Sequence, residues 1–341
     1  YDVREKFEGV LIDVPPAVVL GTDVFDHFLD ENNLRDFALN AGNDAEIMQR
    51  FVNAKKFSEE ILGDLAAFLD LVREPLAVRS SSLLEDSQYH PFAGVYETYM
   101  IPNNSSDPFV RLGELVTTIK RVYASTFYQS AKDYIRVTSY RLEEEKMAVI
   151  IQRMVGSPHD VRFYPDFSGV AKSYNFYPIP PQKSQDGIVS MALGLGKQIV
   201  DGGMTVRFCP KYPHSLLQFS SPAVALKNNQ NDFFALELNS SPLKAEGRSD
   251  VLLNRFSLQA AEEDETLRFV GSTYSKENDA IHDGLSRQGI RLVTFAPVLR
   301  QKLFPLAEII ELLLDMGTWG LGTPVEIEFA VKMSVPVGKP K

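Results

Sequence analysis

The sequence contains a single cysteine, Cys209, so no disulfide can form within the chain. It also lacks a secretory signal and an apolar run long enough to cross a bilayer, and these absences predict a cytoplasmic protein. A P-loop is missing, because the best approximation to its ending, Gly196-Lys197-Gln198, fails at the third position. No cysteines and histidines have zinc-site spacing, and no Gly-x-Ser-x-Gly elbow supports a serine hydrolase.

Positive charge is also in short supply. The chain carries 45 acidic residues against 35 lysines and arginines, which gives a formal net charge of -10. A surface of this sign disfavours broad contact with nucleic acid or with an anionic membrane. It leaves room for a small, locally basic pocket that binds a polyphosphate.

The length of the chain predicts more than one hydrophobic core. A chain of 341 residues exceeds what one core usually serves, so we expect two lobes, over residues 1–145 and 146–341. Helical and strand-like patterns alternate along the chain, which predicts an α+β protein. The sequence starts at Tyr1 and ends shortly after Pro340, and we interpret it as a piece of a larger protein.

Three segments have a clear helical pattern. Asp107-Pro108 supplies an N-cap and a proline at the first helical position, and apolar residues then recur at helical spacing through Phe127. The segment Asp44 to Leu71 is amphipathic, with an expected interruption near Lys55. Pro305 to Met316 predicts an apolar helix with Gly317 as its C-cap.

Two further segments have the pattern of strands, and two have the composition of surface segments. Met147 to Val155 is a nearly continuous apolar run, typical of a strand covered on both faces, while Val325 to Met333 alternates strictly. The charged stretch Arg141 to Lys146 is interpreted as a surface boundary. The polar segment Ser257 to Gln288 is also expected on the surface.

The first candidate site follows the strand Leu76-Ala-Val-Arg-Ser-Ser-Ser82. A strand that delivers Arg79 into a serine-rich loop suits phosphate binding, because a guanidinium, hydroxyls and backbone N–H groups all donate hydrogen bonds. Gly94 would let backbone approach a phosphate closely. The alternative is structural: Arg79 at a strand end pairs with Glu85 or Asp86.

The second candidate site is Glu326-Ile-Glu328. Alternate residues of a strand share a face, so the two carboxylates would project together, roughly 6.5–7 Å apart along the strand. Such a pair can hold Mg²⁺ ions that bridge the phosphates of a nucleotide. An ordinary solvated strand face is the alternative.

The third candidate site combines the strand Val149 to Val155 with Ala192-Leu-Gly-Leu-Gly-Lys197. Backbone N–H and C=O groups where the strand leaves the lobe can recognise the edge of an adenine, and Met154 can pack on its ring. Gly194 and Gly196 could admit the ribose or the phosphates. The alternative is structural: a methionine at such a position more often belongs to a core, and a lone Gly-x-Gly is often only a turn.

The order and wording of these blocks resemble the nucleotide-binding domain of phosphoenolpyruvate synthases and pyruvate phosphate dikinases. Leu76 to Asp86, followed by Phe92-Ala-Gly-Val-Tyr-Glu-Thr98, is similar to that family's "VRSSA-x-x-ED … FAG-x-x-ET". Further along the chain, four shorter blocks resemble the family's "VIVQ-x-MV", "SGV", "WGLGE" and "PxDIEWA" in the same order: Ala148 to Val155, Ser168 to Val170, Ala192 to Gly196 and Pro324 to Phe329.

The resemblance implies an ATP-grasp fold of two lobes, with mixed sheets and flanking helices. It implies a phosphotransferase that uses ATP and Mg²⁺ to phosphorylate a histidine on a separate domain, which passes the phosphoryl group to pyruvate at a third domain. Both domains would lie outside this chain. Carried over to matching positions, the implied ATP-binding residues are Arg79, Ser80, Gly94, Glu97, Gln152, Met154, Val155, Gly194 and Gly196, the metal ligands are Glu326 and Glu328, and the catalytic residues are Arg79 and Glu328.

The sequence departs from the family at several positions. The glutamate expected after Gly196 is Lys197, and Lys172 to Asn175 replaces an arginine- and aspartate-containing stretch. These departures motivate an alternative function, a catalytically degenerate nucleotide-binding regulatory module. A scaffold lobe that binds no nucleotide is a third possibility.

Overall fold

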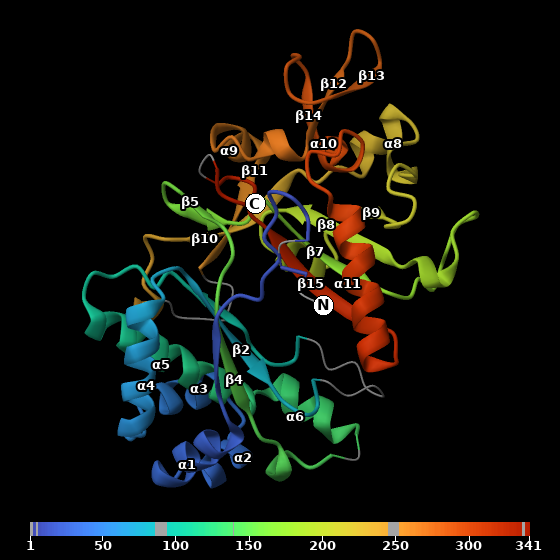
Figure 1. Cartoon of the computed structure of the whole chain (residues 1–341). Coiled ribbons are helices and arrows are strands. Elements are labelled where there is room, and N and C mark those ends of the chain that lie inside the picture. The colour runs from blue at the N-terminus through green and yellow to red at the C-terminus, as the bar shows by residue number, and fades with distance from the viewer. Residues whose placement is uncertain (1–2, 5, 86–93, 139, 245–251, 336–337) are drawn as a thin grey trace. The chain divides into compact units, whose positions relative to one another are not determined.

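The computed structural model describes residues 3–4, 6–85, 94–138, 140–244, 252–335 and 338–341 (Figure 1). The chain forms two compact units, each assembled from separate segments of the sequence. Unit 1 contains residues 1–13, 155–235 and 254–341, and unit 2 contains residues 14–154 and 236–253. Mixed helices and antiparallel sheets in both units confirm the α+β class.

A four-stranded antiparallel sheet forms the centre of unit 2, in the order β1-β4-β2-β3. Its inner strand β4 is the apolar run expected from the sequence, with Val149 and Ile151 fully buried. β4 pairs with β1 and β2, so hydrogen bonding holds it in unit 2, whereas the sequence placed it after a boundary at residue 145. The strands are β1 (Ala17–Leu20), β2 (Leu76–Ser81), β3 (Tyr99–Ile101) and β4 (Ala148–Arg153).

In the part of unit 2 that the structure describes, six helices accompany this sheet, and α5 packs against both α3 and α4 (Figure 1). The side chain of Asp107 caps α5 by accepting from the N–H of Phe109, as the sequence predicts. The amphipathic segment is interrupted near Lys55, also as predicted, which separates α3 from α4. The helices are α1 (Thr22–Glu31), α2 (Arg35–Asn40), α3 (Asp44–Val52), α4 (Glu59–Leu71), α5 (Pro108–Ser125) and α6 (Gln129–Arg136), and two 3-10 turns cover Leu142–Glu144 and Pro242–Lys244.

Unit 1 contains an antiparallel sheet of order β15-β7-β8-β9, a three-stranded sheet of order β13-β12-β14 and a sheet of order β11-β10-β6-β5. The strands are β5 (Ser157–His159), β6 (Arg162–Tyr164), β7 (Phe167–Lys172), β8 (Ile188–Leu193), β9 (Val206–Phe208), β10 (Asp232–Glu237), β11 (Leu253–Ser257), β12 (Gly271–Ser275), β13 (Ala280–Asp283), β14 (Ile290–Val293) and β15 (Glu326–Val331).

The helices of unit 1 are short except for α11, which packs against β7. We expected this helix to stop at Gly317, but it continues through it and ends at Gly322, which has a φ of +68°. Gly317 instead lies where an added Cβ would come within 3.1 Å of Val325. The helices are α7 (Lys197–Val200), α8 (Pro222–Lys227), α9 (Leu258–Glu263), α10 (Ala296–Leu299) and α11 (Leu306–Leu321), and 3-10 turns cover Ser184–Asp186, Leu217–Phe219 and Leu267–Phe269.

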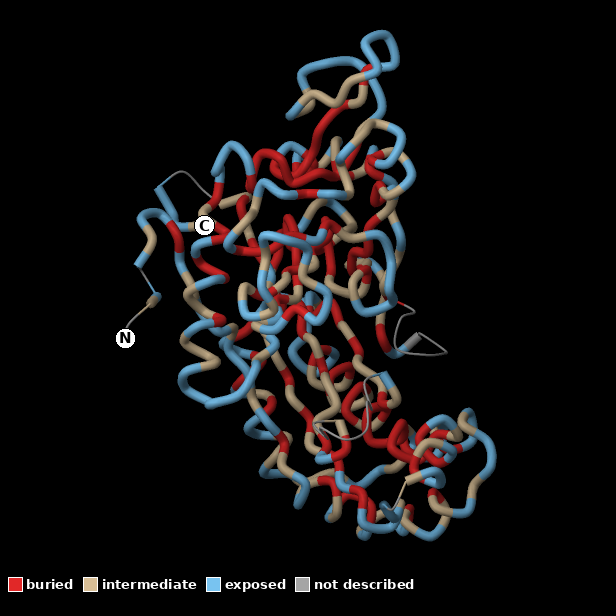
Figure 2. Tube along the Cα trace, turned by 90° about the vertical axis from the view of Figure 1, so that its right-hand side faces the viewer, coloured by how far each residue is buried: buried red, intermediate tan, exposed pale blue. Residues whose placement is uncertain are grey.

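The polar segment from Ser257 to Gln288 is only partly exposed. Its turn at residues 276–279 is exposed, at the top of Figure 2, but Ser272 and Thr273 of β12 are completely buried. Their hydroxyls have partners inside the unit: Ser272 Oγ lies 2.5 Å from Thr294 Oγ1, and Thr273 Oγ1 donates to the carbonyl of Gly284. Because the hydroxyls are hydrogen-bonded, β12 can be buried despite its polar composition.

Candidate functional site

Arg79 and Ser80 lie on β2, beside the inner strand of unit 2. Their register partners on β4 are Ile150 and Val149. Both residues are half-buried, and as neighbours on a strand their side chains project from opposite faces of the sheet. The strand therefore places an arginine and a serine at its C-terminal end, as the sequence analysis expected.

The loop after β2 contains several hydrogen bonds to the side chains of Glu85 and Ser82. Ser80 Oγ donates to Glu85 Oε1 at 2.7 Å, and the N–H of Ser82 donates to Glu85 Oε2 at 3.1 Å. Ser82 Oγ accepts from the N–H groups of Leu84 and Glu85 at 3.2 and 3.4 Å. A carboxylate thus receives the type of donors, a hydroxyl and a loop N–H, that the sequence analysis assigned to phosphates.

Gly94 and Glu97 lie on the segment that leads into β3. Gly94 is exposed and has a φ of +80°, and no atom of the described residues lies within 4 Å of the position that a Cβ would take. The space that a closely approaching ligand would need is therefore present. The N–H of Glu97 donates to Ser125 Oγ at 3.2 Å, which attaches the segment to the end of α5. Asp86, Phe92 and Ala93 of the predicted motif lie outside the described residues.

Two residues that the sequence analysis did not select, Tyr96 and Glu145, connect these loops. Tyr96 Oη donates to Glu145 Oε1 at 2.9 Å, and the Ser82 hydroxyl lies close enough to both groups to lower the pKa of each by hydrogen bonding. Burial raises the pKa of Glu145, although the hydrogen bonds from Ser82 and Tyr96 act in the opposite direction. Glu145 is only 8 % exposed, so the surface interpretation of Arg141 to Lys146 is wrong at this residue.

The end of β4 carries the residues expected beside an adenine. Gln152 is half-buried between Ala17 of β1 and Ala77 of β2, and Met154 is 8 % exposed. The N–H of Met154 donates to the carbonyl of Pro75 at 2.8 Å, so this N–H already has a partner within unit 2. A base edge would therefore need other backbone groups of this segment, such as those of the half-buried Val155.

The two glycines after β8 differ in their surroundings. Gly194 is buried with a φ of +81°, and an added Cβ would lie 2.8 Å from the carbonyl oxygen of Phe234 on β10. This close approach is sufficient to require a glycine at position 194, without any role in ligand binding. Gly196 is half-buried, and a Cβ there would meet only Ser168 Oγ, at 3.8 Å. The residue that departs from the family pattern, Lys197, forms an ion pair of 3.1 Å with Asp201.

Glu326 and Glu328 lie on the edge strand β15, opposite Lys172 and Val170 of β7. Both glutamates are exposed, whereas Ile327 between them is half-buried, so they share one face as the alternation predicted. Glu326 forms an exposed ion pair with Lys172, with Oε2 2.8 Å from Nζ. The described residues contain no cluster of three or more histidine, cysteine, aspartate or glutamate side chains that could hold a metal ion, so a cation here would rely on these two carboxylates and on other ligands.

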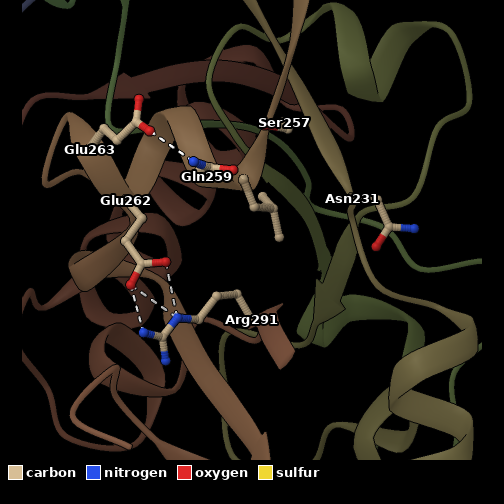
Figure 3. A pocket seen from close by; sticks show the side chains of 7 residues that line it. Asn231, Ser257, Gln259, Glu262, Glu263 and Arg291 are labelled. Atoms are coloured by element: carbon tan, nitrogen blue, oxygen red, sulfur yellow. Dashed lines mark hydrogen bonds and ion pairs between the residues drawn. The ribbon is translucent and has the colours of Figure 1, made fainter. Parts of the chain in front are cut away.

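A separate open pocket of about 680 Å³ lies in unit 1 beside α9 (Figure 3). The polar groups that line it bind one another. Arg291 Nη2 donates to Glu262 Oε1 at 2.6 Å, and the neutral amide of Gln259 donates to Glu263 at 3.0 Å. The arginine of the pocket is therefore already paired with a carboxylate, and none of the residues predicted from the sequence lines this pocket.

A buried ion pair joins Arg162 of β6 to Asp264 in unit 1. Arg162 donates to both carboxylate oxygens, at 3.0 and 2.7 Å, and Tyr164 Oη donates to Oδ2 at 2.7 Å. Burial raises the pKa of Asp264, but these hydrogen bonds outweigh it and hold the pKa below its usual value. The arrangement is a satisfied internal pair, which is typical of a structural role.

Comparison with known proteins identifies the family. A model of the family described as "Pyruvate phosphate dikinase, AMP/ATP-binding domain" matches residues 3–335. The chain therefore belongs to this family, whose domain has an ATP-grasp-type fold, and the resemblance inferred from the sequence blocks is confirmed. It is an ATP-binding domain of the pyruvate phosphate dikinase and phosphoenolpyruvate synthase family.

Curated relatives are similar over little more than half of the chain. The chain is 27% identical over 195 residues to the "Uncharacterized phosphotransferase YvkC" of Bacillus subtilis, covering 56% of the chain and 20% of that protein. It is 28% identical over 214 residues to a "Phosphoenolpyruvate synthase" of Aeropyrum pernix, covering 57% and 24%. It is 27% identical over 204 residues to the "Prodigiosin synthesizing transferase PigC" of Serratia marcescens, covering 56% and 19%. The chain thus spans about a fifth to a quarter of the length of these relatives.

No helix in the described ranges combines the length and the apolar character needed to cross a bilayer.

Proposed function

We propose that this chain is the ATP-binding module of a phosphotransferase, which uses ATP and Mg²⁺ to phosphorylate a histidine on a separate domain. The observation that carries the proposal is the family match over residues 3–335, together with the sequence blocks in their family order. The names of two relatives, a phosphotransferase and a phosphoenolpyruvate synthase, support the reaction class. The histidine domain and a pyruvate-binding domain would lie outside this chain, and the proposed location is the cytoplasm.

The proposed roles follow from the chemistry of each group. Arg79 and Ser80 donate to phosphate oxygens, and Gly94 allows backbone to approach them, because nothing occupies the space beside its Cα. Glu97 belongs to the same loop. Gln152, Met154 and Val155 contact the adenine, and Gly194 and Gly196 contribute to the nucleotide site at the turn after β8. Phosphoryl transfer depends on such positioning and on charge neutralisation more than on covalent help from the protein.

Glu326 and Glu328 suit a magnesium ion that is shared with ATP. Mg²⁺ is usually held by one or two carboxylates together with substrate phosphates and water, and these glutamates offer two exposed carboxylates on one strand face. A bound Mg²⁺ would neutralise charge on the phosphates. Lys172 pairs with Glu326, so a metal ion bound there would compete with this lysine.

Titration of ATP with and without Mg²⁺ tests the metal assignment. We expect Mg²⁺ to tighten ATP binding to the wild-type chain, and we expect Glu328→Gln to lose most of that gain while keeping its affinity in the absence of metal. Glu277→Gln is the matched control, since Glu277 is exposed in the turn after β12 of the same unit. An undiminished Mg²⁺ effect in Glu328→Gln would contradict the assignment.

Label transfer tests the acceptor. The chain is incubated with γ-labelled ATP, Mg²⁺ and an added histidine-bearing domain from a phosphoenolpyruvate synthase. The proposal predicts label on that domain that is stable to base and lost in acid, the behaviour of a phosphohistidine, and predicts none with Arg79→Ala. ATP binding without any transfer would favour the alternative function.

That alternative is a catalytically degenerate module that binds nucleotide and regulates another protein. Two observations favour it: Lys197 replaces the family's glutamate and is paired with Asp201, and Glu85 already accepts the Ser80 hydroxyl. The alternative predicts ordinary ATP affinity with no turnover. A measurable rate of phosphoryl transfer to any histidine-bearing partner would exclude it.

A further inference from the structure

Three segments far apart in the sequence of unit 2 meet at one buried carboxylate. Glu145 accepts from Tyr96 Oη at 2.9 Å and from the Ser82 hydroxyl, and all three residues are at most 8 % exposed. Tyr96 and Glu145 are 49 positions apart. Ser82 begins the loop after β2, and Tyr96 lies between Gly94 and Glu97.

We propose that Glu145 and Tyr96 are positioning residues, which hold the Ser80 to Glu85 loop and the Gly94 to Glu97 segment in a geometry that binds the phosphates of ATP. The inference rests on the proposed function, and it assigns a role to two residues that neither the motifs nor the comparisons select. Neither residue is proposed to touch ATP.

The hydrogen bonds show how the effect would reach the loop. Ser82 connects Glu145 to the turn, because its hydroxyl also accepts from the N–H groups of Leu84 and Glu85. Glu85 in turn holds the Ser80 hydroxyl. A change at residue 145 therefore reaches Ser80 through two intermediate residues.

The same carboxylate also fixes Tyr96, two residues after Gly94. A fixed Tyr96 limits the positions that Gly94 can take beside a phosphate group. Preorganisation of this kind lowers the entropy cost of binding.

Stability alone does not explain a glutamate here. In the described part of unit 2 the hydrogen bonds to this carboxylate come from two hydroxyls, Tyr96 and Ser82, and its desolvation disfavours the charged form. Apolar side chains of similar size often stabilise a buried position better than a buried charge does, whereas polar networks hold one conformation. These properties fit a glutamate that holds Tyr96 and Ser82 in one conformation.

Affinity for ATP compared with affinity for AMP separates positioning from a merely structural role. AMP lacks two of the phosphates, so a residue that arranges phosphate-binding loops should affect it less. For Tyr96→Phe we expect ATP affinity to fall about tenfold, within the range by which residues that touch no ligand modulate binding, and AMP affinity to change less than about twofold. Calorimetric titration at constant Mg²⁺ measures both.

Tyr123→Phe is the matched control. Tyr123 is fully buried on α5 of the same unit, and its hydroxyl has no hydrogen-bond partner among the described residues. The same atom is removed, yet both affinities should stay at the wild-type values. Thermal unfolding of each variant verifies that it is folded.

Glu145→Ala and Glu145→Gln complete the test. A glutamine keeps a carbonyl oxygen that can accept from Tyr96, so we expect near wild-type ATP affinity in Glu145→Gln and a loss in Glu145→Ala. Parallel losses of ATP and AMP affinity, or no loss in any of these variants, would overturn the inference while leaving the proposed function intact. A wild-type chain that binds no ATP would instead remove the proposed function, and this inference with it.

Discussion

Asp264 of unit 1 and Glu145 of unit 2 are both buried acids, yet their environments differ. Arg162 holds both oxygens of Asp264, at 3.0 and 2.7 Å, whereas Glu145 accepts from the hydroxyls of Tyr96 and Ser82. Accordingly the pKa of Asp264 is held below its usual value, and burial raises the pKa of Glu145. A paired acid of the first kind supports folding, while an acid of the second kind costs stability and is better explained by the loops it arranges.

The two glycine turns repeat this contrast. Gly194 of unit 1 and Gly94 of unit 2 have nearly the same φ, +81° and +80°. At Gly194 the neighbouring space is filled by β10, and at Gly94 it is open. Among the described residues, the space beside Gly94 is therefore open to a ligand, whereas packing against β10 is sufficient to require a glycine at position 194.

The largest expected effect is the loss of stability when the ion pair between Arg162 and Asp264 is broken. Arg162→Ala would leave Asp264 buried without its cation, and we expect the free energy of unfolding to fall by about 3–5 kcal/mol. Arg268→Ala, which removes an exposed arginine 3.3 Å from Glu265, should cost less than about 1 kcal/mol. Denaturant unfolding measures both losses. Equal losses would contradict the distinction between the shielded ion pair of Asp264 and the exposed ion pair of Glu265.

Alanine substitutions at Gly194 and Gly94 should distinguish an effect on stability from an effect on ATP affinity. Gly194→Ala combines a strained φ with a contact of 2.8 Å to the Phe234 carbonyl, so we expect a loss of about 2–3 kcal/mol. Gly94→Ala meets no neighbouring atom and should cost only about 1 kcal/mol of stability, while lowering ATP affinity. A Gly94→Ala variant that binds ATP normally would refute the open-loop assignment.

The smallest expected effect is a difference in pH dependence. Asp264, with its lowered pKa, contributes stability that is complete above about pH 4 and is lost as the pH falls further, so the advantage of wild type over Asp264→Asn should be constant from about pH 5 to 8. The raised pKa of Glu145 contributes stability that is complete below its usual value of 4.5 and is lost as the pH rises through the folded-state pKa. Relative to Glu145→Gln, wild type should therefore become less stable as the pH rises through the folded-state pKa.

Thermal unfolding of the wild type and the two variants, at intervals from about pH 4.5 to pH 8, measures this. The difference for Glu145→Gln should change with pH, and that for Asp264→Asn should stay flat. Two flat series, or a change of the opposite sign at Glu145, would contradict the contrast.

Local patterns in the sequence predicted the elements that depend on neighbouring residues. The Asp107 cap of α5, the buried strand β4 and the alternation that places Glu326 and Glu328 on one face all follow from short-range rules. The sequence blocks also predicted the family and hence the fold class, which the family match confirms.

Contacts between distant segments were not predictable in this way. Glu145 lies in a charged stretch that is typical of a surface, and its burial depends on Tyr96 and Ser82. Gly194 resembles a nucleotide-binding glycine until β10 is placed beside it. The division of the chain also depends on β4 pairing with β1 and β2, which no local pattern near residue 145 reveals. The roles of the ATP-binding and metal-binding residues stay predictions.

Calorimetric titration of Mg-ATP into wild type, Arg79→Ala and Arg136→Ala tests the central claim most directly. Arg79 ends β2 at the proposed phosphate loop, while Arg136 is an exposed arginine on α6 of the same unit that pairs with Asp133. The account predicts that wild type and Arg136→Ala bind alike and that Arg79→Ala loses about tenfold or more in affinity, the effect of a lost charge-assisted hydrogen bond. Equal binding by all three proteins would contradict it.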